Sequence, residues 1–125
     1  MEQKHNINEM ASRLTEPYKR LMVGQVDDYC AFLVRIEGSY LFHQHRKDEM
    51  YLVLEGELAV DYADGETVIL KKGDSLVAEA GEKHRSRSEK GAVALIFKHQ
   101  ACLRGREVKT RLARLKELLR NNLPF

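Results

Sequence analysis

The chain has 125 residues, of which 43% are hydrophobic and 32% charged, and its formal net charge is +2. These values are typical of one soluble globular domain, because a chain of this length buries a single hydrophobic core and not two. The apolar runs are too short to span a bilayer, and from its polar N-terminus we do not expect a signal peptide. Because two cysteines form no disulfide framework, we expect a protein of the reducing cytoplasm.

The first predicted element is a short helix over residues 6–15, within an N-terminal lead-in of residues 1–24. Asn6 and Glu9 have the spacing of a helix N-cap and its reciprocal partner, and apolar residues recur at helical intervals after them. Pro17 is expected to end this helix.

From Asp28 to Lys98 the pattern changes to short strands separated by turn residues, within a domain of residues 25–103. Asp64-Gly65 is a strong signal for a tight hairpin. Many short strands at this spacing favour an all-β antiparallel sandwich or barrel. The predicted strands cover residues 29–36, 39–45, 49–55, 57–62, 66–70, 75–79, 84–88 and 92–98.

The last predicted element is an amphipathic helix from about residue 105 to 121, within a C-terminal segment of residues 104–125. The segment of residues 104–125 has seven basic and two acidic residues, so it carries the positive charge of the chain and the remainder is negative. The body of the protein is therefore not expected to bind nucleic acid or a membrane. An apolar seam along the helix consists of Val108, Leu112, Leu115, Leu119 and Leu123.

His43 and His45 are the start of a predicted metal site. Residues two apart on a strand point to the same face, so both imidazoles can reach one ion at about 2.1 Å. Glu49 returns across a short charged turn and can add a carboxylate oxygen, and His84 completes a set of three nitrogens and one oxygen. Four possible ligands at consistent parity make hydrogen-bonded core histidines the less favoured interpretation.

The residues around these ligands resemble the two sequence motifs of the cupin superfamily. Residues 38–56 contain the glycine, the His-x-His pair, the glutamate and the second glycine of the first motif, and residues 73–88 resemble the second motif. The chain departs from the family pattern at Glu79, where proline is usual, at Ser88, where asparagine is usual, and in the spacing of Gly38. None of these departures removes a ligand.

The resemblance covers about residues 25–98. Within the superfamily, the chain is similar to the small single-domain microbial cupins that are themselves similar to mannose-6-phosphate isomerase. It implies a double-stranded β-helix, which is a jelly-roll barrel. It also implies that His43, His45, Glu49 and His84 bind one divalent transition metal, either Fe, Mn, Ni, Cu or Zn. Raw affinity does not choose among these ions.

Strand parity predicts which side chains surround the metal. If the ligands face inward, so do Leu41, Tyr51, Ser86 and Ser88, and no inward lysine or arginine is identified. An aromatic residue such as Tyr51 most often only packs in a core. Glu49 and Tyr51 are nevertheless the two candidate catalytic residues. The serines are expected to hold water. Arg46, Arg85 and Arg87 face outward, as a rim that attracts anions or as a solvated edge.

Three functions remain open on these residues. The first is a metal-dependent enzyme, isomerase-like or lyase-like, in which the ion polarises a small oxygen-rich metabolite such as a sugar or keto compound. The second is an oxygen-dependent dioxygenase, and the third is a small-molecule binding or sensing module without catalysis. The fold does not choose between them.

A homodimer is the expected assembly. With Glu49 inward, Met50, Leu52 and Leu54 form an outward apolar row that needs a cover. We expect the strands around the first motif to form much of the interface and the C-terminal helix to add to it.

Overall fold

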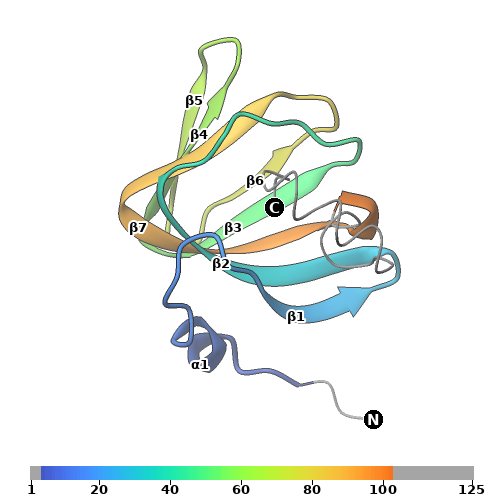
Figure 1. The fold of residues 1–125 in the computed structure, drawn as a ribbon, viewed down its shortest axis with the longest axis vertical. Helices are drawn as coiled ribbons and strands as arrows, with labels where there is room; N and C mark the ends of the chain where they lie inside the picture. The colour runs from blue at the N-terminus through green and yellow to red at the C-terminus, as the bar shows by residue number, and fades with distance from the viewer. Residues whose placement is uncertain (1–3, 103–125) are drawn as a thin grey trace, which may run out of the picture.

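Alternating apolar and polar residues between Leu21 and His99 form strands that close into an antiparallel barrel (Figure 1). The computed structural model describes residues 4–102. The elements are α1 (Ile7–Ala11), β1 (Leu21–Val26), β2 (Tyr29–Ser39), β3 (Glu49–Glu55), β4 (Glu57–Tyr62), β5 (Thr67–Lys71), β6 (Ser75–Ala78), β7 (His84–His99) and the 3₁₀ helix η1 (Gln100–Cys102). The all-β jelly-roll prediction is confirmed.

The long strand β7 connects the parts of the barrel. Its first half pairs with β4, and its second half lies between β2 and β3. Outside these pairs, β1 pairs with β2, β6 with β3 and β5 with β4, and all of the pairs are antiparallel. Side chains on both halves of β7 therefore face the same barrel interior.

The barrel interior is filled by one face of each strand. In β3 the side chains of Glu49, Tyr51 and Val53 are buried, and the alternate residues Met50 and Leu52 are only half-buried. The apolar part of this core includes Phe32, Val34, Ile36, Leu58, Val60 and Ile96, all fully buried. Burying these side chains stabilises the fold by about 1.5–3 kcal/mol each before entropy is considered.

Gly56 closes the turn between β3 and β4 at a point where a side chain does not fit. Its φ is +78°, and a Cβ atom there would lie 2.5 Å from the carbonyl oxygen of Gly91. Both the backbone conformation and the close approach therefore require glycine.

The predicted strands β3 and β4 are confirmed to the residue, and other predictions need correction. Of the strand predicted at residues 39–45, Ser39 ends β2 and residues 40–45 form no extended strand, since only His43 makes an isolated bridge, to His84. Leu41 is accordingly 58% exposed and does not face inward. The two strands predicted at 84–88 and 92–98 are one strand, β7.

The N-terminal region also differs from the prediction. Asn6 caps α1, because its Oδ1 accepts a hydrogen bond from the Glu9 amide at 2.9 Å. The helix nevertheless ends at Ala11, well before Pro17. Strand β1 was not predicted, because Gly24 interrupts its apolar pattern at a register shift against β2.

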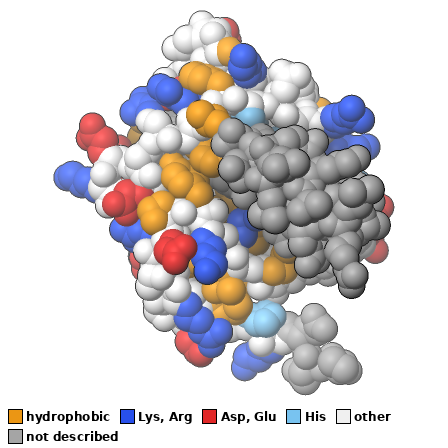
Figure 2. All heavy atoms as spheres, viewed as in Figure 1, with side chains coloured by type: hydrophobic (Ala, Val, Ile, Leu, Met, Phe, Trp, Pro, Cys, Tyr) orange, Lys and Arg blue, Asp and Glu red, His pale blue; other side chains and the backbone are white. Residues whose placement is uncertain are grey.

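The predicted C-terminal helix lies outside the described residues. No helix within residues 4–102 is long and apolar enough to cross a membrane. Figure 2 shows a band of hydrophobic side chains on one face of the molecule. Among the described residues, the large hydrophobic side chains that remain exposed are Met22, Val26, Leu41, Phe42, Ile69 and Val77.

Candidate metal centre

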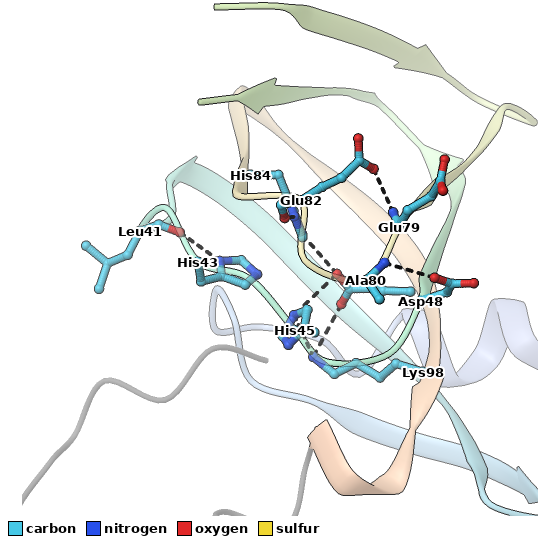
Figure 3. A network of polar contacts seen from close by, with 10 residues as sticks. Leu41, His43, His45, Asp48, Glu79, Ala80, Glu82, His84 and Lys98 are labelled. Carbon is cyan, nitrogen blue, oxygen red and sulfur yellow. Dashed lines mark hydrogen bonds and ion pairs between the residues drawn. The ribbon is translucent and has the colours of Figure 1, made fainter. Parts of the chain in front are cut away.

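The four predicted ligands lie on segments that the backbone holds together at one end of the barrel. His43 and His84 exchange both of their backbone hydrogen bonds, each at 2.9 Å. The carbonyl oxygen of His45 accepts a hydrogen bond from the Gly81 amide at 2.9 Å, and Asp48 Oδ1 accepts one from the Ala80 amide at 2.9 Å. The loop that carries the His-x-His pair is thus fixed to the loop before β7 (Figure 3).

The ligand atoms converge at distances that suit one metal ion. One atom from each of His43, His45, Glu49 and His84 lies within 4.8 Å of all the others. Glu49 Oε1 lies 3.1 Å from His84 Nε2 and 3.5 Å from His45 Nε2. Bonds of about 2.1 Å place adjacent ligands about 3.0 Å apart and opposite ligands about 4.2 Å apart. The donor set and its spacing therefore fit a divalent transition metal with small adjustments.

Hydrogen bonds to backbone carbonyls orient two of the histidines for this role. His43 Nδ1 lies 2.8 Å from the Leu41 oxygen, and His84 Nδ1 lies 2.8 Å from the Glu82 oxygen (Figure 3). A carbonyl oxygen only accepts, so each Nδ1 carries the hydrogen. Nε2 is then directed into the site, and in His84 it donates a hydrogen bond to Glu49 Oε1 at 3.1 Å, so this proton must leave before the lone pair can bind a metal.

Lys98 belongs to this site and was missed in the sequence. Its side chain is fully buried, and its Nζ lies 3.3 Å from Glu49 Oε2 and 3.5 Å from His45 Nε2. Lys98 stands directly opposite Glu49 in the pairing of β7 with β3, so both side chains point to the same face. The sequence analysis identifies no inward lysine, and the structure shows that Lys98 is one. Ala92, Ala94 and Ile96 lie on one face of β7, and continuing their alternation places Lys98 on the same inward face. The sequence does not reveal this face, because the intervening residues Val93, Leu95 and Phe97 are apolar as well.

The charges in the site shift the pKa values of its ligands. Burial by itself raises the pKa of Glu49, but the Lys98 charge and the hydrogen bonds from His45 and His84 hold it well below its usual value. Burial lowers the pKa of His43 to about 4. Burial also acts to lower the pKa of His84, but the hydrogen bonds to Glu49 and to the Glu82 carbonyl and the charge of Glu49 together outweigh it, and this pKa is raised. Glu49 is therefore an anion at neutral pH.

Tyr51 lies beside the ligands in the barrel interior. Its side chain is fully buried, and its hydroxyl has no hydrogen-bond partner among the described residues. Burial and the neighbouring Glu49 charge raise the pKa of this phenol well above 10. Ser86 is also fully buried, and its hydroxyl lacks a partner among the same residues. Such groups are expected to bind water or a ligand.

Three other predicted residues have structural roles instead. Ser88 donates its hydroxyl hydrogen to the Glu57 carbonyl at 2.7 Å, so it does not hold water at the metal site. Arg85 and Arg87 bind Asp61 at 2.9 Å and 2.6 Å, so both guanidinium groups are engaged by this one carboxylate.

A hollow of about 700 Å³ lies elsewhere on the barrel, and none of the four ligands lines it. Its lining includes Lys71, Lys72, Arg87 and Lys90. It is wide open to solvent and brings together no convergent buried polar groups, so the chemistry is assigned to the histidine cluster.

Comparisons with known proteins agree with this geometry. Residues 32–97 match the family model described as a Cupin domain. The chain is 37% identical over 101 residues to an uncharacterized protein, YdbB, of Bacillus subtilis, an alignment that covers 80% of this chain and 89% of the relative.

Solved structures share the fold. A cupin-2 domain protein of Shewanella frigidimarina aligns with a TM-score of 0.74 at 24% identity, over 78% of this chain and 95% of that one. The hydroquinone 1,2-dioxygenase PnpCD, in complex with Cd²⁺ and 4-hydroxybenzonitrile, aligns with a TM-score of 0.66 at 24% identity, over 78% of this chain and 72% of that one. At this level of identity the similarity concerns the fold alone.

Proposed function

The chain belongs to the cupin family, and from this membership we propose that it is a metal-dependent enzyme of isomerase-like or lyase-like type acting on a small oxygen-rich metabolite. The observation that carries the proposal is the convergence of three imidazoles and one carboxylate inside the barrel, beside polar groups that satisfy no structural need. A site of this kind binds an ion and leaves polar groups for a ligand.

The residues divide into two roles. His43, His45, Glu49 and His84 would hold a divalent ion, either Fe, Mn, Ni, Cu or Zn, and such an ion supplies Lewis-acid polarisation of a bound oxygen group. Tyr51 would donate a hydrogen bond or a proton to that group, because its raised pKa keeps the phenol protonated at neutral pH.

Glu49 is better suited to ligation than to proton transfer. Its Oε1 faces the two histidine nitrogens and its Oε2 is held by Lys98 at 3.3 Å. Its pKa is held well below the usual value, so the carboxylate is a weak base. We therefore assign the proton-donating role to Tyr51, and Ser86 would hold a water molecule or a substrate hydroxyl beside it.

The polar character of the groups beside the ligands favours chemistry without oxygen. Tyr51, Ser86 and Lys98 are all fully buried at this end of the barrel. A dioxygenase needs a redox-active ion and a mainly apolar pocket for its organic substrate. The hydroquinone dioxygenase shares the fold only, so oxidative chemistry is an outcome to be tested rather than a second proposal.

The test begins with protein purified without an affinity tag and analysed for metal content. The apoprotein is then loaded separately with Zn(II), Mn(II) and Fe(II) and screened against sugars, sugar phosphates, keto compounds, diketones and catechols, with oxygen uptake monitored. Turnover with Zn(II) or Mn(II) and no oxygen uptake supports the proposal. Turnover that requires Fe(II) and consumes oxygen supports a dioxygenase. Ligand binding without any turnover supports a binding module.

A further inference from the structure

We propose that Tyr18 positions His43 in the metal centre, by holding the ring of Tyr40 against the imidazole. This inference rests on the proposed metal centre and names a positioning residue of that same site.

The backbone of Tyr18 has a conformation that tyrosine rarely adopts. Pro17 and Tyr18 form a turn between α1 and β1, and the φ of Tyr18 is +66°. A proline followed by a residue at positive φ is the pattern of a type II turn, in which the second position normally carries glycine or asparagine. A bulky residue at positive φ is strained, and such strain persists only where the surrounding structure holds the residue in place. The tyrosine side chain is therefore expected to make contacts that outweigh the strain.

Tyr18 is attached to the chain just before the loop that carries His43. Its amide donates a hydrogen bond to the Arg35 carbonyl at 2.8 Å, and its hydroxyl donates one to the Gly38 carbonyl at 3.2 Å. Its ring lies against the ring of Tyr40, with the centroids 4.9 Å apart and the planes inclined by 37°. The turn is thus attached at three points, and the third of them is an aromatic contact.

Tyr40 connects this support to the predicted ligand. The rings of Tyr40 and His43 meet edge to face, with the centroids 5.5 Å apart and the planes at 89°. Aromatic rings at this distance and angle attract each other. The Tyr40 amide also donates a hydrogen bond to the Ser86 carbonyl at 2.9 Å, which fixes the Tyr40 backbone against β7. Tyr40 therefore limits rotation of the imidazole, because its own ring is held by Tyr18.

His43 lies in a stretch of chain with little regular pairing. Residues 40–45 form no extended strand, and Leu41 and Phe42 are 58% and 39% exposed. The Nδ1 of His43 makes its hydrogen bond to the carbonyl of Leu41, within this same exposed stretch. The bridge to His84 fixes the backbone of the stretch, and the aromatic contacts fix the direction of the imidazole.

This support belongs to the N-terminal part of the chain. Tyr18 lies outside residues 32–97, which match the Cupin domain model. It is partly buried and packs against the barrel core, as does Tyr40. The two tyrosines therefore join a segment outside the matched domain to one of the four predicted ligands.

The test compares Co(II) binding in variants that remove one ring at a time. Tyr18→Leu and Tyr40→Leu each remove one ring, and the double variant removes both. Tyr18→Gly also removes a ring but suits the positive φ of the turn. Tyr18→Phe keeps the ring and loses only the hydroxyl. Tyr29→Leu is the matched control, because Tyr29 stacks on Phe97 with centroids 5.4 Å apart, in a pair that contains none of the predicted ligands.

Co(II) affinity is measured by chelator competition at one pH, coordination by visible absorption, and stability by denaturant unfolding of the apoprotein. Loss of a group that orients a metal ligand costs about tenfold to a hundredfold in affinity. Tyr18→Leu, Tyr18→Gly and Tyr40→Leu should each bind Co(II) about tenfold more weakly and change its absorption. The double variant should lose little more than either single variant, because both rings act through one contact. Tyr18→Phe should keep the affinity and the absorption, as should Tyr29→Leu despite its loss of stability.

Three results would overturn the inference while the metal centre stands. The first is that folded Tyr18→Leu and Tyr18→Gly match the wild type in affinity and absorption, and the second is that Tyr29→Leu is weakened as much as they are. Either would show that Tyr18 only packs the fold. The third is a loss in Tyr18→Phe equal to that in Tyr18→Leu, which would show that the ring is not the group that acts.

A failure of the metal centre itself is seen in the wild type. If the wild type does not bind Co(II), the proposed function fails and the role of Tyr18 fails with it. Circular dichroism identifies the folded variants. If Tyr18→Leu does not fold, Tyr18→Gly and Tyr40→Leu decide between the outcomes.

Discussion

His43 and His84, 41 positions apart in the sequence, form a residue pair that exchanges both backbone hydrogen bonds at 2.9 Å. Residues paired in this way stand directly opposite each other, with their side chains on the same face. Their imidazole centroids are 4.6 Å apart, tilted by 57°. This single bridge fixes the loop before β3 against the start of β7 and so brings the predicted ligands together, without the strand predicted at residues 39–45.

The first prediction concerns metal content. The wild type should bind one divalent ion per chain, and His45→Ala should reduce the affinity by at least about tenfold to a hundredfold, by loss of one ligand. The barrel should remain folded, because its apolar core does not depend on the ion. Elemental analysis and chelator competition measure the first effect, and circular dichroism measures the second. His5→Ala, an exposed histidine outside the cluster, is the control. A wild type without metal that is unaffected by chelators would refute the site.

The second prediction concerns pH. A metal binds the neutral imidazole, and the hydrogen bond to Glu49 raises the pKa of His84, so a proton must leave His84 before the ion binds. Metal affinity should therefore fall as pH is lowered from 8 to 6. His43 adds no competition in this range, because its pKa is about 4. Titrations in buffers of different ionisation enthalpy should show proton release on binding. An affinity that is constant over this range would contradict the prediction.

The third prediction concerns the hydroxyl of Tyr51. In Tyr51→Phe we expect unchanged metal content and a loss of turnover of about a hundredfold on whichever substrate the screen identifies. The melting temperature should not fall, because the deleted hydroxyl is buried without a hydrogen-bond partner among the described residues. Tyr29→Phe, on β2, is the control. Equal turnover by Tyr51→Phe and the wild type would make Tyr51 a packing residue only.

The fourth prediction concerns the stability of the barrel. Asp61 accepts hydrogen bonds from Arg85, Arg87 and Thr67. The hydrogen bond from Arg87 acts most strongly and holds the pKa of Asp61 far below its ordinary value of 3.8. Asp61→Asn should cost about 1–2 kcal/mol at pH 7, since both arginines are partly exposed.

The pH dependence of this effect has a defined sign. The folded-state pKa of Asp61 is depressed, so its contribution is fully present above about pH 3.8 and is lost as the pH falls below that value. The difference in unfolding free energy between wild type and Asp61→Asn should therefore shrink in acid. Denaturant unfolding at pH 7 and pH 3 measures it, with the exposed Asp28→Asn as control. A difference that persists unchanged at pH 3 would show that the carboxylate charge is not involved.

The fifth prediction concerns assembly. Val77 of β6 is 48% exposed, and Met50 and Leu52 on the neighbouring strand β3 are only half-buried, which suits an interface. We expect a homodimer, and deletion of residues 104–125 should shift it towards monomer or aggregate without loss of metal. Light scattering after size exclusion measures the mass. A full-length chain that stays monomeric at high micromolar concentration would exclude this assembly.

The sequence by itself determined the class of fold and predicted which four side chains come together as candidate ligands. The spacing of His43, His45, Glu49 and His84, and the alternation in β3 and β4, are local properties of the chain, because strand parity and turn chemistry act over a few residues.

Only the tertiary structure decided which side chains from distant strands become neighbours. Strand pairing placed Lys98 beside Glu49, bound Arg85 and Arg87 to Asp61, and turned Ser88 towards Glu57. In β7 both faces are apolar near residues 92–97, so parity alone did not identify the inward face. A charge is tolerated in the interior only where its counter-charge lies opposite, and that position depends on the register between strands 49 residues apart.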